Sequence, residues 1–252
     1  MAGHSHWAGI KHKKARVDAA RGKLWSKLSR NVTMAARTGG GDLSANPRLR
    51  LAVDKARAAN MPRDSIERAI KKGTGELEGA SYEEVTYEGY AAGGVALMCE
   101  VMTDNRNRTQ PEIKKIFESS GGNLGAAGCV AFLFERKGLL TVSVEDVDED
   151  RLIEIAAEAG ADDIKPTGQI FEITTPPESY EAVKKALDAA EIETEVAEIS
   201  WVAQSQITID ADTGRKVLTL IDKLQDHDDV QNVYSNFDVP DEVMAQLAAE
   251  TS

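Results

Sequence analysis

Residues 139–202, LLTVSVEDVDEDRLIEIAAEAGADDIKPTGQIFEITTPPESYEAVKKALDAAEIETEVAEISWV, decide the fold of the second half of the chain. Short runs in which apolar and polar residues alternate predict strands, and two longer segments with apolar residues at helical spacing predict helices. The predicted limits are a strand at 139–144, a helix at 149–159, strands at 163–166 and 169–174, a helix at 178–190 and a strand at 196–202. This β-α-β-β-α-β order is that of a ferredoxin-like domain.

Residues 82–134, which precede the ferredoxin-like segment, have a related but shorter pattern of strands and a helix. Thr109 and Glu112 form a capping box that starts a helix, with Pro111 in its first turn. Strands are predicted around this helix at 82–90, 95–102 and 130–134. A helix and strand that would complete the pattern lie near the C-terminus. The candidate segments there are a strand at 207–210, a helix at 214–225 and a strand at 230–235.

We therefore expect a discontinuous middle domain, formed by residues 76–136 and 207–240. The ferredoxin-like domain, residues 137–206, is inserted into it, and residues 241–252 form a tail. Residues 1–75 are predicted to be helical throughout. The predicted class is α+β with three domains: an all-helical basic N-terminal domain followed by two α/β domains, the last ferredoxin-like and inserted into the middle one.

The N-terminal domain is predicted to contain helices separated by glycine and proline signals. In the helix at 24–36, apolar residues gather on one face and Lys or Arg on another. The glycines at 39–41 end this helix. Asn46 caps a second helix, with proline at its first position, and Pro62 opens a third.

Charge is divided unevenly along the 252 residues. Residues 1–75 carry 17 Lys or Arg and 5 Asp or Glu, a formal charge of +12, whereas residues 76–252 carry 13 and 37, a formal charge of −24. This asymmetry indicates a basic domain that meets a polyanion, while the acidic remainder repels phosphate. The alternative is that the two halves pair with each other inside the molecule.

The candidate nucleic-acid-binding residues follow from this charge. Trp7 is predicted either to stack on an unpaired base or to pack under the first helix. Arg106 and Arg108 precede a helix start, where they would either bind an anion or form ion pairs with nearby carboxylates. The full set is Trp7, Lys11, Lys13, Lys14, Arg16, Arg21, Lys23, Lys27, Arg30, Arg37, Arg48, Arg50, Arg106 and Arg108.

Several functional classes are not expected. There is no phosphate-binding loop, no Ser- or Cys-centred triad motif, no apolar run long enough to cross a membrane and no secretory signal. Cys99 and Cys129 cannot form a disulfide framework.

The aspartates around His227 favour a solvated loop over a cation site, and Ala2-Gly3-His4 would hold Cu(II) or Ni(II) only after removal of the first residue. We expect a cytoplasmic, monomeric protein that is not an enzyme, with no cofactor, no metal, no membrane partner and no small-molecule substrate.

Nine short motifs occur in order along the chain: GHSHW (3–7), IKHKK (10–14), DAARGK (18–23), GGGD (39–42), NPRLR (46–50), NMP (60–62), IERAIKKG (66–73), TYEGY (86–90) and TDNRNRT (103–109). Together they resemble the YebC/PmpR family, to which the mitochondrial translational activator of cytochrome c oxidase is related. The resemblance runs essentially end to end, with His6 in place of the usual lysine and Gly9 in place of asparagine. It implies a helical first domain followed by two α/β domains.

The resemblance implies two functions. Members of the family are described as transcriptional regulators that bind DNA, and some members instead act on the ribosome, where they relieve stalling at proline-rich stretches. The expected partners are therefore DNA, ribosomal RNA or the ribosome, contacted through the N-terminal domain. A third hypothesis is an interaction scaffold whose basic helices dock on its own acidic domains.

Overall fold

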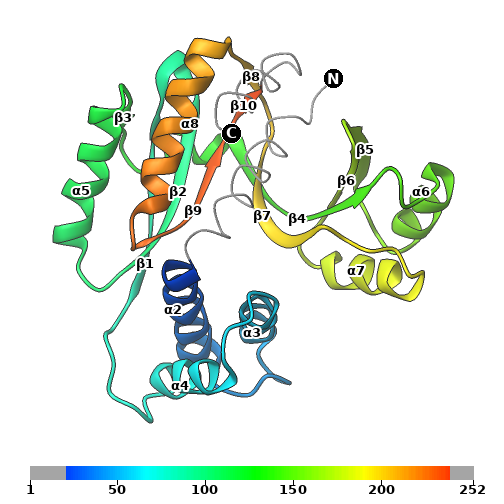
Figure 1. The fold of residues 1–252 in the computed structure, drawn as a ribbon, viewed down its shortest axis with the longest axis horizontal. Helices are drawn as coiled ribbons and strands as arrows, with labels where there is room; N and C mark the ends of the chain where they lie inside the picture. The colour runs from blue at the N-terminus through cyan, green and yellow to red at the C-terminus, as the bar shows by residue number, and fades with distance from the viewer. Residues whose placement is uncertain (1–20, 239–252) are drawn as a thin grey trace.

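The structure is a computed structural model in which residues 21–238 are described, and it contains one helical domain and two sheets with attached helices (Figure 1). The helices are α2 (Arg21–Gly39), α3 (Pro47–Ala58), α4 (Arg63–Gly73), α5 (Arg106–Ser119), α6 (Glu149–Glu158), α7 (Tyr180–Ala189) and α8 (Ala211–Asp226). The strands are β1 (Glu83–Tyr90), β2 (Ala96–Thr103), β3 (Asn123–Leu124), β4 (Phe134–Ser143), β5 (Asp163–Thr167), β6 (Ile170–Thr175), β7 (Val196–Ala203), β8 (Ile207–Thr208), β9 (Val230–Ser235) and β10 (Phe237–Asp238).

Helices α2, α3 and α4 pack around an aliphatic core that includes Leu28, Val32 and Leu49. Asn46 caps α3 as predicted, because its side-chain Oδ1 accepts a hydrogen bond from the N–H of Leu49 at 3.0 Å. At the end of α4, a Cβ on Gly73 would lie 2.4 Å from the carbonyl oxygen of Thr33 on α2. The absence of a side chain at Gly73 therefore permits the close approach of α2 and α4.

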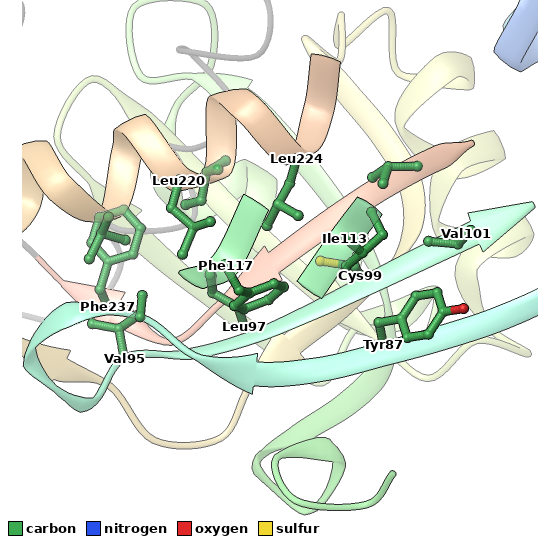
Figure 2. Packing of buried hydrophobic residues seen from close by; sticks show 14 of the residues in the cluster. Tyr87, Val95, Leu97, Cys99, Val101, Ile113, Phe117, Leu220, Leu224 and Phe237 are labelled. Atoms are coloured by element: carbon green, nitrogen blue, oxygen red, sulfur yellow. The ribbon is translucent and has the colours of Figure 1, made fainter. Parts of the chain in front are cut away.

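The middle sheet has the strand order β3-β1-β2-β9, and every neighbouring pair is antiparallel. Helices α5 and α8 cover one face, where Leu97 and Cys99 of β2 meet Phe117 of α5 and Leu220 and Leu224 of α8 (Figure 2). Strand β9 pairs with β2 although strands β4 to β7 lie between them in sequence. The chain thus leaves this sheet and returns to it.

The inserted sheet has the strand order β5-β6-β4-β7, again with antiparallel neighbours. Its core contains Leu140, Val142 and Phe171 from the strands and Leu152 and Val183 from α6 and α7. This order is that of the ferredoxin-like arrangement. The predicted α+β class, with a helical first domain and a ferredoxin-like domain inserted into the middle one, is confirmed; the residue limits between the domains stay a prediction.

The face of the middle sheet opposite α5 and α8 packs against one end of the inserted sheet. Ala96 and Met98 of β2 form a small buried cluster with Val130 and Phe134, and Trp201 of β7 packs against it. Between this cluster and the helices α2 and α3, the interface is lined mostly by polar side chains. The three domains therefore meet around one polar junction.

The strand predicted at 130–134 is wrong. Residues Ala131–Leu133 form a short 3-10 turn, and Phe134 begins a single strand, β4, that also contains the strand predicted from 139. The cause is the buried carboxylate of Glu88, which accepts the backbone N–H groups of Gly128, Val130 and Ala131 at 2.7 to 2.8 Å. Because these N–H groups are occupied, the segment does not join a ladder there. The short strand β3, which the sequence did not predict, pairs with β1.

Two smaller expectations are also corrected. Asn105, and not Thr109, caps α5: its Oδ1 accepts from the N–H of Arg108 at 3.2 Å, so the helix begins at Arg106. The hydroxyl of Thr109 is turned into the protein, 2.7 Å from an oxygen of Asp229. Strand β8 pairs with β10, parallel to it, and does not join the middle sheet. In the range 21–238, no helix combines the length and apolar character needed to cross a membrane.

Candidate nucleic-acid interface

The predicted basic residues divide into those that the structure describes and those that it does not. Arg21 is the first residue of α2, and only its backbone is described. The remaining candidates that lie outside the described residues are Trp7, Lys11, Lys13, Lys14 and Arg16, and the Ala2-Gly3-His4 terminus lies outside them as well.

Lys23, Lys27 and Arg30 project from α2 to the C-terminal end of α8. The backbone carbonyls that accept from their side chains are, in the same order, those of Asp226 (3.1 Å), Gln225 (2.6 Å) and Asp228 (2.5 Å). The last carbonyls of a helix have no partner within it and carry a partial negative charge, which favours nearby cations. This part of the predicted polyanion surface is therefore engaged inside the molecule, as the alternative of internal pairing expected.

Asp229 is the centre of these contacts. Its side chain is 5% exposed; one oxygen lies 3.1 Å from Nη1 of Arg30, and the other lies 2.6 Å from Nη2 of Arg108 and 2.7 Å from the hydroxyl of Thr109. Burial alone would raise the pKa of Asp229, but the hydrogen bonds from Thr109 and Arg108 and the charges of both arginines outweigh it and lower that pKa. Asp229 therefore joins α2, α5 and the start of β9 as a carboxylate.

Arg106 and Arg108 were predicted either to bind an anion or to form ion pairs with nearby carboxylates, and the structure differs between the two residues. Arg108 forms an ion pair with Asp229 and another with Asp104 at 3.1 Å. Arg106 lies 3.9 Å from Glu83, and both side chains are more than half exposed. Since exposed pairs of this kind are weak, Arg106 keeps its capacity to bind an anion and Arg108 is mainly a structural residue.

The other three predicted cations also have partners within the protein. Arg37 donates to the hydroxyl of Ser81 at 2.6 Å and Arg48 pairs with Glu84. Arg50 donates to the backbone carbonyls of the loop before α3. Their exposed positions permit exchange of these partners for phosphate, since surface pairs contribute little to stability.

A row of exposed cations without a partner among the described residues lies on α4. Arg68, Lys71 and Lys72 are exposed and form no hydrogen bond or ion pair within residues 21–238. Arg68 and Lys72 line a groove of about 450 Å³ between α2 and α4, and Arg30 lines its other side. The groove also contains hydroxyl and aromatic side chains, namely Ser26, Ser29, Thr33, Ser65, Trp25 and Tyr82. The guanidinium of Arg30 lies over the ring of Tyr82, 5.4 Å from its centroid.

The cations on α4 are not among the residues predicted from the sequence, although their spacing in the sequence indicates them. Arg68, Lys71 and Lys72 are spaced three and four residues apart, so they share one side of a helix. Ile66 and Ala69 of the same helix are buried against α2. The combination of a buried apolar stripe and a basic row with no acidic residue between its members predicts a surface for anions.

Comparison with known proteins gives two matches to family models. The model of the TACO1/YebC N-terminal domain matches residues 5–76, and the model of the TACO1/YebC second and third domain matches residues 82–237. The chain belongs to the TACO1/YebC family. The helices with the basic groove thus lie within the part that matches the N-terminal model, and both sheets lie within the part that matches the second.

Similar proteins cover the YebC-family chain almost completely. A "probable transcriptional regulatory protein" of Halothermothrix orenii is 54% identical over 99% of this chain and 100% of its own length. A protein with the same description from Desulforapulum autotrophicum is 52% identical over 96% of this chain and 98% of its own length. The crystal structure of a conserved hypothetical protein from Aquifex aeolicus has a TM-score of 0.83 and 52% identity, and covers 94% of this chain and 98% of the other.

The described part of this YebC-family member presents a row of exposed cations beside a groove and no metal site. Residues 21–238 contain no group of three or more His, Cys, Asp or Glu side chains that would hold a metal ion. The aspartates near His227 act instead as partners of α2 and α5, and His227 itself lies 3.0 Å from Glu112. The basic groove therefore carries the argument for function.

Proposed function

We propose that this YebC-family protein is a nucleic-acid-binding regulator of gene expression in the cytoplasm, that it has no catalytic role, and that it contacts DNA as a regulator of transcription. The observation that carries the proposal is the row of unpartnered cations, Arg68, Lys71 and Lys72, beside the groove between α2 and α4. The descriptions of its relatives as transcriptional regulators support the same function.

The groove suits a phosphate backbone for electrostatic reasons. Arg68 and Lys72 on one wall, with Lys71 beside them on α4, would neutralise phosphates and release condensed counterions. The hydroxyls of Ser26 and Ser65 add donors of the kind that commonly contact phosphate and sugar. Binding should therefore be strong at low salt and fall steeply as salt is added.

A second candidate function is that of a translation factor that binds ribosomal RNA. It is favoured by the chemistry of the exposed face of α4, which carries Arg, Lys, Glu and Asp but no Asn or Gln, the residues that read adenine in the major groove. Structured RNA is recognised through shape, phosphates and 2′-hydroxyls, and its unpaired bases stack on aromatic rings. Tyr82 and Trp25 at the groove provide such rings.

The proposal is tested by replacing Arg68, Lys71 and Lys72 together with alanine in the full-length protein. Affinity for a 30-base-pair DNA and for a structured RNA of equal length is measured across a salt series. We expect weaker binding and a decrease of about 2 to 3 in the salt slope, since each lost phosphate contact lowers that slope by about one. A matched control replaces three exposed cations outside the first domain, Lys114, Lys115 and Lys185.

The two triple variants remove equal charge, so a nonspecific effect of net charge would appear in both. Equal binding by the groove variant and the wild-type protein would overturn the proposal. Crosslinking in cells followed by sequencing of bound DNA and RNA then distinguishes the two targets. Recovery dominated by promoter DNA supports the regulator of transcription, and recovery dominated by ribosomal RNA replaces it with the translation factor.

A further inference from the structure

A second hollow lies at the junction of the three domains and is separate from the groove between α2 and α4. Its volume is about 330 Å³, within the lower part of the range for small-molecule sites. Asn31 and Arg48 of the first domain line one side, and Glu84, Thr86, Glu100 and residues of β9 line another. Arg136, Ser200 and Trp201 of the inserted sheet complete it. We call it the junction cavity.

One wall of the junction cavity is fixed by hydrogen bonds. The carboxylate of Glu100 accepts from Nε1 of Trp201 at 3.0 Å, from Nδ2 of Asn232 at 3.0 Å and from the hydroxyl of Tyr234 at 2.8 Å. These donors come from two different sheets, and they hold both aromatic side chains in place. The wall is therefore held in place by the protein's own hydrogen bonds.

Other polar groups of the junction cavity have unused hydrogen-bonding capacity. Ser200 is 2% exposed, and neither its hydroxyl nor the Oε1 atom of Gln231 has a partner among the described residues. Buried polar atoms left without a partner are unfavourable, so a polar ligand that supplies a partner would bind there favourably. The side chain of Asn31 likewise makes no hydrogen bond within residues 21–238. These groups can both donate to and accept from a polar molecule.

The cavity also contains an arginine that forms no ion pair with a described residue, although the carboxylate of Glu100 lines the same cavity. Arg48 is paired with Glu84, but Arg136 has no ion-pair partner in the range 21–238. Arg136 is opposite Trp201 in the register between β4 and β7. The guanidinium opposite Trp201, the amide of Asn31 and the free Oε1 atom of Gln231 together suit a phosphate with a base; the Nε2 atom of Gln231 already donates to the carbonyl of Asp229 at 3.4 Å.

We infer that the junction cavity binds a single nucleotide, with the phosphate on Arg136 and the polar edge of the base on Asn31 and Gln231. Amide side chains offer the paired donor and acceptor that base edges require. The cavity adjoins α2, whose Arg30 lines the basic groove and whose Asn31 lines the cavity. The nucleotide is either free or an unpaired residue of a bound strand, and the second case rests on the proposed function.

The test measures binding of AMP, GMP, CMP and UMP to the full-length protein by calorimetry, followed by single strands of eight nucleotides. Arg136→Ala is expected to weaken binding at least tenfold. Thr86→Trp, which places a large ring at an exposed position of the cavity wall on β1, is expected to abolish it while the protein stays folded. The triple replacement of Arg68, Lys71 and Lys72 is the control and should leave mononucleotide binding unchanged.

The outcomes separate the two sources of the nucleotide and the two proposals. Binding of mononucleotides that both cavity variants lose identifies a free nucleotide as ligand, even if the groove binds no nucleic acid. Binding of the eight-nucleotide strands alone, again lost in both cavity variants, identifies a residue of a strand. The inference is overturned if neither probe binds, or if Arg136→Ala and Thr86→Trp bind both probes as the wild-type protein does.

Discussion

Arg30 and Asp229 lie 3.1 Å apart in an ion pair although 199 positions separate them in the sequence. The pair connects α2 of the basic domain to the residue directly before β9 of the middle domain. It also brings Arg30 to the edge of the basic groove, where the same side chain lies over Tyr82. Arg30 thus attaches the basic domain to the middle domain at the edge of the groove.

Replacement of Asp229 by asparagine should destabilise the protein. The change removes the charge that holds Arg30 and Arg108 and leaves these donors with a weaker acceptor in a buried position. We expect a loss of about 1–3 kcal/mol in the free energy of unfolding, measured by urea denaturation. Asp228→Asn is the matched control: Asp228 is exposed and contacts Arg30 only through its backbone carbonyl, so that change should stay within about 0.5 kcal/mol.

The effect of Asp229→Asn should depend on pH. The pKa of Asp229 is lowered in the folded protein from an ordinary value of 3.8, so the stabilisation is present above that value and is lost as pH falls through the lowered one. Wild-type and variant stabilities should therefore differ at pH 7 and converge below about pH 4. A difference that stays constant down to pH 3 would contradict the role of the ionised carboxylate.

Arg106 and Arg108 should respond differently to alanine substitution. Loss of Arg108 removes two ion pairs, one of them to a buried carboxylate, and we expect a clear decrease in melting temperature. Loss of Arg106, whose long contact to Glu83 is exposed, should cost less than about 0.5 kcal/mol. Weaker nucleic-acid binding by Arg106→Ala at an unchanged melting temperature would place Arg106 in the interface. Unchanged binding would show that Arg106 does not contribute to the interface.

The order of strands and helices could be predicted from sequence because local patterns encode it. Alternation and helical spacing in residues 139–202 give the ferredoxin-like order, and Asn46 before a proline gives the start of α3. The strand expected at 130–134 failed for a nonlocal reason. Its backbone N–H groups are taken by the side chain of Glu88, about forty residues earlier, and no local pattern reports such a contact.

The candidate site was predicted less completely than the fold. Charge counting found the basic domain, but it did not show that Lys23, Lys27 and Arg30 would meet the end of α8, because that contact joins segments about 200 residues apart. The spacing of Arg68 and Lys72 already indicated one face of a helix. The prediction did not include them because basic residues are denser nearer the N-terminus. Local charge density alone does not reveal which cations remain free after folding.

Asn46 should be one of the most sensitive positions of the first domain. It is 4% exposed, its Oδ1 caps α3, and its Nδ2 donates to the carbonyls of Ala35 and Gly40 at 2.8 Å. Asn46→Ala removes all three bonds, and we expect a loss of about 1–3 kcal/mol by thermal or urea denaturation. Asn46→Asp keeps the acceptor for α3 but turns a carboxylate oxygen toward the carbonyl oxygens of Ala35 and Gly40, so it should be at least as destabilising as Asn46→Ala. Equal stability of all three proteins would contradict this assignment.

Glu172 should make the protein less stable as pH rises. It lies on β6 between β4 and β5, burial raises its pKa from 4.5 to about 7 despite the nearby charge of Lys165, and its Oε2 atom has no partner among the described residues. Between pH 4.5 and about 7 the folded state retains a proton that the unfolded state has released, so the free energy of unfolding falls through this window.

Glu172→Gln mimics the protonated side chain and removes that penalty. The variant should match the wild-type protein at pH 4 and exceed its stability at pH 8 by about 1–3 kcal/mol, measured by urea denaturation at both values. The same substitution at the exposed Glu178 serves as control and should shift stability equally little at both pH values. Parallel stability curves for Glu172→Gln and wild type from pH 4 to pH 8 would show that the buried carboxyl does not control this part of the pH dependence.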